Sequence, residues 1–254
     1  MDPAHRQSSH QVRLEWGPTG ADAIAEGADI AVVVDVLSFT TTLCVALEQG
    51  IRVLPFAWRD ERAAAYADAH DAVLAVGRHE ARRDGARGVS LSPETLLGAR
   101  GIERLVLPSP NGSALCARLA DRGVQVVGAC LRNRSAVAAW LAPQLAEGAV
   151  VAVLPAGERW PDGTLRPAIE DLWGAGAVLD ALPTGRRSAE AAAASRAFVA
   201  VGDDLAAQLL DCASGRELVE ASYAADVRIA AELDVADVVP LLGADGFAPA
   251  PERS

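Results

Sequence analysis

The segment from Ile30 to Gly50, IAVVVDVLSFTTTLCVALEQG, constrains the fold of this chain more than any other stretch. It opens with five consecutive apolar residues, mostly β-branched, which predict a strand buried on both faces. The carboxylate of Asp35 ends this run, and a helical pattern follows a polar hinge at 38–42. Ligands of α/β proteins bind beyond the carboxyl ends of such strands, and helix N-termini attract anions. The segment therefore predicts a site for a metal ion, a phosphate group or both.

Strand and helix patterns alternate along most of the chain, as is typical of α/β proteins. From residue 188 onward the sequence is almost wholly helical, but no linker separates this part from the rest. We therefore expect one unit, 1–254, with a division into an α/β lobe at 1–185 and a helix-rich lobe at 186–254. A short strand is expected at 235–240, and the last residues, GADGFAPAPERS, are expected to form a frayed tail.

The composition narrows the class of protein. The 254 residues carry a formal net charge of −11 and show no basic stripe, so nucleic-acid binding is not expected. The polar N-terminus lacks a signal-peptide core, and no apolar run approaches the roughly 20 residues of a membrane span. The four cysteines form no C-x-x-C pair and predict buried free thiols in a reducing compartment. We therefore expect a soluble, cytoplasmic protein without a membrane partner.

Polar residues follow four of the predicted strands at the point where each strand ends. Because the carboxyl ends of parallel strands meet at one edge of a sheet, these residues are expected to converge. A fifth polar position, Glu170-Asp171, opens a helix. The four strand exits are Asp35 with Thr40, Thr41 and Thr42; Asn111, Gly112 and Ser113; Arg132, Asn133, Arg134 and Ser135; and Gly157 with Glu158.

Three carboxylates, Asp35, Glu170 and Asp171, are the candidate metal ligands. An unpaired carboxylate after an apolar strand is costly to desolvate, although Asp35 is equally suited to cap the turn that follows it. Glu170 and Asp171 either compensate the dipole of their helix or bind a cation. Mg²⁺ prefers carboxylate oxygens, water and substrate phosphate, and these three side chains would satisfy it.

Other polar residues are candidates for anion binding. The segments Thr40–Thr42 and Asn111–Ser113 each precede a helix, where backbone N–H groups and a hydroxyl can hold a phosphate. Arg132 and Arg134 either bind a second anionic group or remain solvated at a helix start. The sequence contains no P-loop and no G-x-S-x-G elbow, which disfavours P-loop nucleotide binding and serine hydrolase chemistry. His79, in a charged loop, is a further candidate acid or base.

These motifs, in this order, resemble the 2-phosphosulfolactate phosphatase family, the ComB-like proteins. The matching stretches span nearly the whole chain and are specific only when taken together. They are VVVDVLSFTTTLCVALEQG from Val32, PNGSAL from Pro110, GACLRNRSAVA from Gly128, AGER from Ala156, IEDLWGAGAVLDAL from Ile169, and SGREL with ADV from Ser214 and Ala225.

The resemblance implies a Mg²⁺-dependent acid phosphatase that converts 2-phosphosulfolactate to sulfolactate and phosphate in coenzyme M biosynthesis. It also implies an α/β fold with a mixed, mostly parallel sheet flanked by helices and two unequal lobes; a homodimer is one possible assembly. Carried over position by position, the family's motif residues fall on Asp35, Thr40–Thr42, Asn111-Gly112, Asn133 and Glu170-Asp171.

Two departures from the family pattern bear on the substrate. The family usually has an arginine where this chain has Ser38, in a run similar to D-V-L-R-A-T-T, and an arginine there would neutralise substrate charge. The loop pattern also differs. In place of G-E-R-G-G and G-F-D-L-G-N-S-P, this chain has Gly77-Arg78-His79 and the segment from Gly88 to Pro93. The glutamate and the aspartate of the pattern have no clear counterparts.

Three hypotheses follow. The first is a Mg²⁺-dependent phosphatase acting on a small anionic phosphorylated acid, with Asp35, Glu170 and Asp171 as catalytic residues. The attacking group is either a metal-activated water or Asp35 itself, through an aspartyl-phosphate. The second is a catalytically silent family member that binds a small anion or acts as a structural partner. The third is a nucleotide-binding α/β enzyme. In the first, the substrate-binding residues are Ser38, Thr40, Thr41, Thr42, Asn111, Gly112, Ser113, Arg132 and Asn133.

Overall fold

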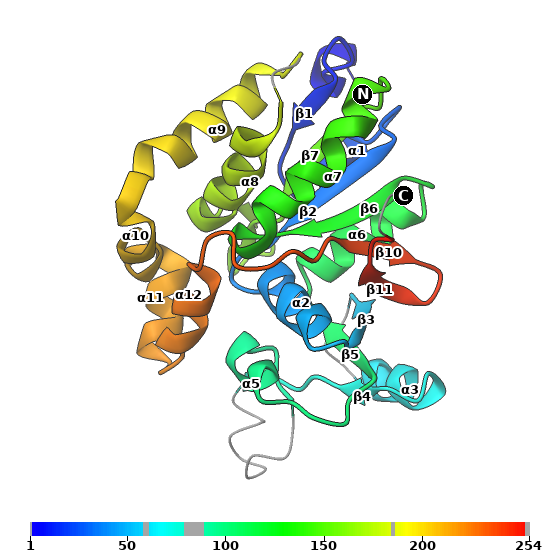
Figure 1. Cartoon of the computed structure of the whole chain (residues 1–254), viewed down its shortest axis with the longest axis vertical. Helices are drawn as coiled ribbons and strands as arrows, with labels where there is room; N and C mark the ends of the chain where they lie inside the picture. Colours follow the sequence, from blue (N-terminus) through cyan, green and yellow to red (C-terminus); the bar gives the residue numbers. More distant parts are fainter. Residues whose placement is uncertain (1, 58–60, 79–88, 184–185, 252–254) are drawn as a thin grey trace.

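The protein is built around a twisted sheet that runs through its centre (Figure 1). The computed structural model describes residues 2–57, 61–78, 89–183 and 186–251. Within them the sheet has nine strands in the order β1-β7-β2-β6-β10-β11-β3-β5-β4. The strands are β1 (Val12–Leu14), β2 (Ile30–Val34), β3 (Arg52–Phe56), β4 (Val73–Leu74), β5 (Arg104–Pro108), β6 (Gln125–Ala129), β7 (Val151–Pro155), β10 (Pro240–Gly243) and β11 (Gly246–Pro249).

Helices cover both faces of this sheet. One face packs against α7, α8 and the C-terminal helices, and the other packs against α1, α2 and α6. A separate two-stranded hairpin, β8 (Glu158–Arg159) with β9 (Leu165–Arg166), follows β7. The helices are α1 (Gly17–Ile24), α2 (Phe39–Glu48), α3 (Glu61–Ala69), α5 (Pro93–Leu97), α6 (Gly112–Ala120), α7 (Arg134–Ala146), α8 (Ile169–Ala181), α9 (Ala189–Val201), α10 (Leu205–Asp211), α11 (Ala213–Glu220) and α12 (Ala224–Ala230).

Strand β2 lies between two parallel neighbours and is buried on both faces, as its apolar run predicts. It pairs in parallel with β7 on one side and with β6 on the other. Ile30, Val32 and Val34 point into one hydrophobic cluster, and Ala31 and Val33 point into the other. Because alternate residues of a strand face opposite sides, an uninterrupted apolar run is what such a position requires. Asp35, the residue after β2, therefore lies at the carboxyl end of a strand that has a parallel neighbour on each side.

The C-terminal hairpin β10–β11 corrects the expectation of a frayed tail. Its two strands pair with each other, and they join β6 on one side and β3 on the other, antiparallel in every case. Asp245-Gly246 is a strong signal for a tight hairpin turn, and Gly246 has a φ of +92° that favours glycine. Phe247, which follows the turn, is fully buried. The hairpin is inserted between two groups of parallel strands and makes the sheet mixed.

The region after residue 186 is rich in helices, as the sequence indicates. Helix α9 lies along α8, and α10, α11 and α12 continue from it around one end of the sheet (Figure 1). The fold is thus an α/β fold with a mixed, mostly parallel sheet and a helical C-terminal region. The division into lobes at residue 185 stays a prediction, and β10 and β11 belong to the main sheet. Among the described helices, none combines the length and apolar character needed to cross a membrane.

Candidate functional site

A cavity of about 240 Å³ opens where β2 and β5 end. Its walls come from the β2–α2 turn, the β5–α6 turn, the β8 strand and the helix α11, so segments far apart in the sequence converge there. The convergence of strand exits expected from the sequence is therefore present for several of them. The polar and charged residues that line the cavity are Asp35, Ser38, Arg78, Ser109, Asn111, Glu158, Ser214 and Glu217.

Asp35 holds two helix N-termini together at the cavity wall. One carboxylate oxygen accepts the Phe39 N–H at 3.1 Å, and the other accepts the Gly112 N–H at 2.9 Å and the Ser109 hydroxyl at 3.4 Å. Asp35 therefore caps the start of α2 and also lines the cavity. Gly112 allows this approach, because a Cβ there would come within 2.7 Å of the carboxylate. The N-termini of α2 and α6, which carry partial positive charge, thus both meet the carboxylate of Asp35.

The three threonines after Asp35 are buried, and their hydroxyls bind backbone carbonyls. Thr40 donates to the Asp35 carbonyl at 2.8 Å and accepts the Asp35 N–H at 2.9 Å. Thr41 donates to Val36, and Thr42 donates to Leu91. None of the three lines the cavity. Within the described residues, these side chains hold the shape of the β2–α2 turn, and substrate contact by their hydroxyls stays a sequence-based prediction.

The start of α6 contributes one cavity residue out of the three predicted. Asn111 lines the cavity, and its side-chain amide donates to Glu158 at 2.8 Å. Gly112 directs its N–H to Asp35, as described above, and is therefore engaged by protein. Ser113 is fully buried and donates its hydroxyl to the Leu107 carbonyl at 2.9 Å.

Glu170 and Asp171 lie buried at the start of α8 and are not among the residues that line the cavity. The two oxygens of Asp171 accept the Val36 N–H at 2.7 Å and the Gly157 N–H at 2.9 Å, so this carboxylate joins the exits of β2 and β7. Glu170 is only 2% exposed and accepts a long hydrogen bond from the Cys212 thiol at 3.6 Å. Burial, with the negative charges of Asp35 and Glu170, raises the pKa of Asp171 well above its usual range.

Glu158 is a cavity residue that the sequence marks as a strand exit without assigning it a role. Burial raises the pKa of Glu158 to about 7, and the negative charge of Asp35 adds to this effect. The hydrogen bond from Asn111 opposes it in part. The signal in the sequence is a carboxylate three residues after the end of a buried strand, followed by a glycine-containing turn.

Asp35, Glu158, Glu170 and Asp171 form a carboxylate cluster whose charges act on one another. The pKa values of Glu158 and Asp171 both rise partly because Asp35 and Glu170 are nearby. Several buried carboxylates that raise one another's pKa fit a hard cation, and oxygen donors are the ligands that Mg²⁺ prefers. No three acidic, histidine or cysteine side chains of the described chain form a ready-made cage. Mg²⁺ commonly uses one or two protein carboxylates together with waters and substrate oxygens, so the donor set is compatible with this ion.

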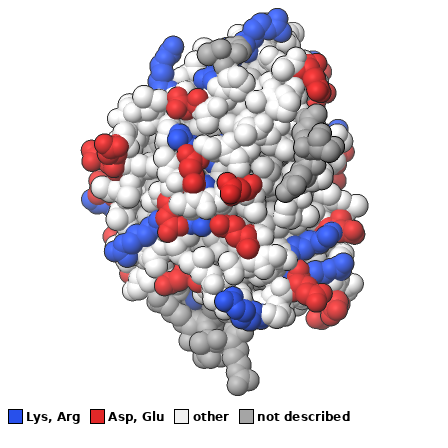
Figure 2. Space-filling view, viewed as in Figure 1, with Lys and Arg blue, Asp and Glu red and all other residues white. Residues whose placement is uncertain are grey.

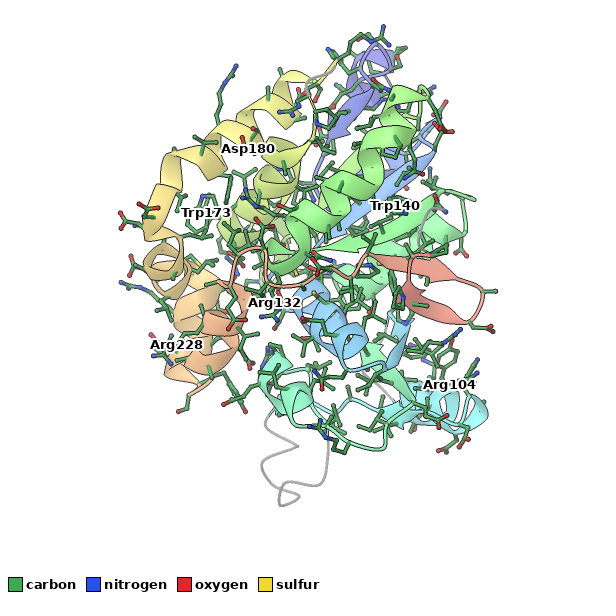
Figure 3. All side chains as sticks on the ribbon, viewed as in Figure 1. Arg104, Arg132, Trp140, Trp173, Asp180 and Arg228 are labelled. Carbon is green, nitrogen blue, oxygen red and sulfur yellow. The ribbon has the colours of Figure 1, made fainter. Side chains whose placement is uncertain are left out.

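Arg132 and Asn133 are placed away from the cavity. Arg132 lies between α12 and α2 (Figure 3), where it pairs with Glu232 and, at 3.0 Å, with Glu48 in the last turn of α2. The cavity lies at the first turn of α2, roughly 13 Å away along the helix. The fully buried Asn133 accepts the Cys130 N–H and donates to the Val238 carbonyl. Both side chains therefore bind protein groups in this structure.

Ser38, a predicted substrate-binding residue, lines the cavity beside Arg78, which the sequence did not indicate as a site residue. The guanidinium of Arg78 donates to the Ser38 hydroxyl and, at 2.8 Å, to the buried carboxylate of Asp226. These contacts connect residues 40 and 148 positions apart, so no local pattern marks them. His79, the candidate acid or base, lies outside the described residues, as does the adjoining part of the loop to residue 88.

On the face shown in Figure 2, the described residues form no basic surface of the kind that binds nucleic acid. Acidic and basic side chains are interspersed there, and those of the described residues form no continuous basic patch. This distribution agrees with the net charge of −11.

Comparison with known proteins adds independent evidence. A model of a family described as 2-phosphosulpholactate phosphatase matches residues 20–245. A protein of Deinococcus radiodurans described as a probable 2-phosphosulfolactate phosphatase is 29% identical over 217 residues, which cover 84% of this chain and 88% of the relative. A protein of Synechococcus sp. strain WH7803 with the same description is 34% identical over 232 residues, covering 86% of this chain and 89% of the relative. The match includes every segment that forms the cavity.

Proposed function

The chain belongs to the 2-phosphosulfolactate phosphatase family, and on this premise we propose that it hydrolyses a small phosphorylated hydroxy acid to the hydroxy acid and phosphate. The observation that carries the proposal is Asp35, a buried carboxylate held by the N-termini of two helices at the wall of a polar cavity. The cavity volume of about 240 Å³ suits a small acid rather than a nucleotide. In the finer form of the proposal the substrate is 2-phosphosulfolactate and the product sulfolactate enters coenzyme M biosynthesis.

We assign Mg²⁺ to the carboxylate cluster, with Asp35, Glu170 and Asp171 as its ligand candidates. The support is the concentration of buried acidic oxygens, whose mutual repulsion a divalent cation would relieve. When bound, the ion would supply positive charge that offsets the negative charge of the phosphate oxygens and makes phosphorus more susceptible to attack. The buried and unbridged cysteines support a reducing compartment, and we place the reaction in the cytoplasm.

The cavity residues supply the remaining parts of the reaction. Asp35 accepts N–H groups from the N-termini of α2 and α6, so both of its oxygens are already hydrogen-bonded. This favours a role in holding charge over one as attacking nucleophile. Glu158, which faces the same cavity, would donate the proton that the leaving hydroxyl oxygen needs. A carboxyl group with a pKa near 7 is still partly protonated at neutral pH.

Phosphate release from 2-phosphosulfolactate, measured with and without Mg²⁺, tests the proposal. Asp35→Asn is expected to lower kcat/KM by about 100-fold or more, because one of the two charged oxygens becomes an amide. Asp162→Asn is the matched control, since Asp162 also accepts a backbone N–H and a hydroxyl but lies exposed in the β8–β9 turn. Thermal denaturation of both variants separates loss of activity from loss of fold. Full activity in Asp35→Asn would show that the site is misassigned.

A catalytically silent anion-binding protein remains the second candidate, because Ser38 stands where the family pattern has an arginine. The discriminating experiment is a screen of phosphorylated acids with Mg²⁺ present. Inactivity on all of them, combined with an increase in melting temperature on adding sulfolactate, would support binding without catalysis.

A further inference from the structure

Arg78 is the one basic residue among the described residues that line the cavity. Its charged neighbours in the lining, Asp35, Glu158 and Glu217, are all acidic. Arg166 donates to Ser214 at the rim but does not itself line the cavity. Among the described lining residues, Arg78 is therefore the side chain whose positive charge can attract an anionic substrate, and a bound cation would be a second source of attraction.

Contacts with three residues from two segments fix the guanidinium of Arg78. The Nε atom donates to Asp226 of α12 at 2.8 Å, and Nη2 donates to the Ser38 hydroxyl of the β2–α2 turn. The aromatic ring of Tyr223 lies 5.5 Å from the guanidinium carbon. Asp226 is fully buried and also accepts the Ser92 hydroxyl, so its position is fixed as well. An arginine held in this way keeps its orientation without any substrate.

One edge of this guanidinium remains available. Nε and Nη2 are used by Asp226 and Ser38, whereas Nη1 has no hydrogen-bond partner within the described part of the chain. The Arg78 side chain is 17% exposed although its partner Asp226 is not exposed at all. A planar guanidinium recognises a carboxylate or sulfonate through such N–H groups.

We infer that Arg78 binds the second acidic group of the substrate, a carboxylate or a sulfonate, while the phosphate lies toward the carboxylate cluster. The inference rests on the proposed function and specifies its substrate as a phosphate ester that carries a further anionic group. It assigns Arg78 a role in specificity rather than in the chemical step. Ser38 is then a positioning residue, because its hydroxyl holds Nη2 and its small side chain leaves room for the guanidinium.

The inference accounts for the departure at Ser38. The family pattern has an arginine at that position in the β2–α2 turn, and this chain provides its guanidinium from residue 78, after β4, to the hydroxyl of Ser38. The guanidinium thus lies at the same β2–α2 turn, although Arg78 belongs to another segment. A serine at position 38 in place of the arginine of the family pattern does not by itself remove anion recognition if Arg78 provides it.

The test compares two esters of nearly the same shape. 2-Phosphosulfolactate carries two acidic groups beside the phosphate, and glycerol 2-phosphate carries two neutral hydroxymethyl groups. Arg78→Met is expected to lower the ratio of kcat/KM for the acid over the neutral ester by roughly 10- to 100-fold, mainly through KM, because one charge-assisted contact is lost. The same measurement with 2-phospholactate identifies the group bound: an equal loss points to the carboxylate, and a loss confined to 2-phosphosulfolactate points to the sulfonate.

Arg134→Met is a closely matched control. Arg134 also pairs with an aspartate at 2.8 Å, lies over an aromatic ring, and is 18% exposed, but it is remote from the cavity. Its substitution should leave the ratio unchanged. The double variant Arg78→Met with Ser38→Arg should restore much of the ratio, since the guanidinium returns to the same turn. An unchanged ratio in Arg78→Met, or a fall produced by Arg166→Met instead, would overturn the inference.

A binding measurement separates the inference from the proposed function. Calorimetric titration with sulfolactate in the presence of Mg²⁺ needs no turnover, and Arg78→Met should weaken binding by at least about 10-fold. If wild-type protein releases no phosphate but shows this difference, the phosphatase proposal fails and the role of Arg78 stands. If wild-type protein hydrolyses both esters and Arg78→Met keeps the ratio of kcat/KM values, the phosphatase proposal stands and the role of Arg78 fails. Equal binding of sulfolactate by both proteins, or no binding by either, contradicts the role of Arg78.

Discussion

Replacing Glu158 by glutamine should stabilise the metal-free protein at alkaline pH and leave its stability nearly unchanged at pH 5. Burial and the charge of Asp35 raise the pKa of Glu158 from 4.5 to about 7. Between these two values the folded protein keeps a proton that the unfolded chain releases, so the free energy of unfolding falls as pH rises. Glutamine keeps an oxygen that can accept the hydrogen bond from Asn111 and carries no charge at any pH.

The size of the effect follows from the two pKa values. A rise from 4.5 to about 7 corresponds to roughly 3 kcal/mol once Glu158 is ionised in both states, and partial solvent access reduces this to about 1–3 kcal/mol. Wild-type protein in EDTA should therefore lose this much stability between pH 5 and pH 8.5 through Glu158, and Glu158→Gln should not. Urea denaturation at intervals of half a pH unit measures the difference.

Glu94→Gln is the control, since Glu94 is an exposed glutamate in the first turn of α5. Its pH dependence should parallel that of the wild type. If Glu158→Gln shows the same loss of stability with rising pH as the wild type, the carboxyl of Glu158 is not held in its neutral form by burial and Asp35. A variant less stable than the wild type at pH 8.5 would refute the reasoning as well.

Three further predictions concern the cation, the hairpin and Arg132. EDTA should abolish phosphate release, and MgCl₂ should raise the melting temperature more at pH 8 than at pH 5, because protons compete for the carboxylate cluster at low pH. Gly246→Ala should cost about 3 kcal/mol of unfolding free energy in urea, since the backbone has a φ of +92° and a Cβ would come within 2.5 Å of the Val53 carbonyl. Arg132→Met should lower stability by about 1–3 kcal/mol while KM changes less than about twofold; a large rise in KM would restore Arg132 to the substrate site.

The strand β2 and its carboxylate could be predicted from sequence because their signal is local. Five apolar residues in a row can be accommodated only where both faces of a strand are covered, and the carboxylate after them must lie at the edge. The exits of β2 and β7, which Asp171 joins, lie together as the topology predicts, because these strands are parallel neighbours. The meeting of Asp35 with Gly112 did not follow from that argument, since the antiparallel hairpin β10–β11 separates β2 from β5 in the sheet. The fold class and the neighbourhood of the site therefore required no knowledge of side-chain directions.

Side-chain direction is what the sequence analysis could not provide. A hydroxyl at a helix start can face a ligand or bind the nearest carbonyl, and Thr40 and Ser113 bind carbonyls because both are buried. Arg132 reaches Glu48 because α2 ends beside the β6 exit, a tertiary fact with no local signature. The C-terminal hairpin did have a local signal, Asp245-Gly246, but it was outweighed by the polar, proline-containing composition of the tail.

Electrostatic properties depend on still longer distances along the chain. Burial raises the pKa of Glu158 to about 7, and Asp35 and Glu170, which are close in space but not in sequence, add to this effect. The same holds for Arg78, which reaches Ser38 across 40 residues and Asp226 across 148. Position-by-position comparison with a family pattern registers Ser38 as a lost charge, because it compares side chains and not the space they occupy. A substrate anion interacts with the charge at its binding position in the cavity. An arginine on any segment that reaches this position can supply the charge, and Arg78 is placed to do so. The swap experiment between residues 38 and 78 therefore tests whether specificity in this chain belongs to a sequence position or to a place in the fold.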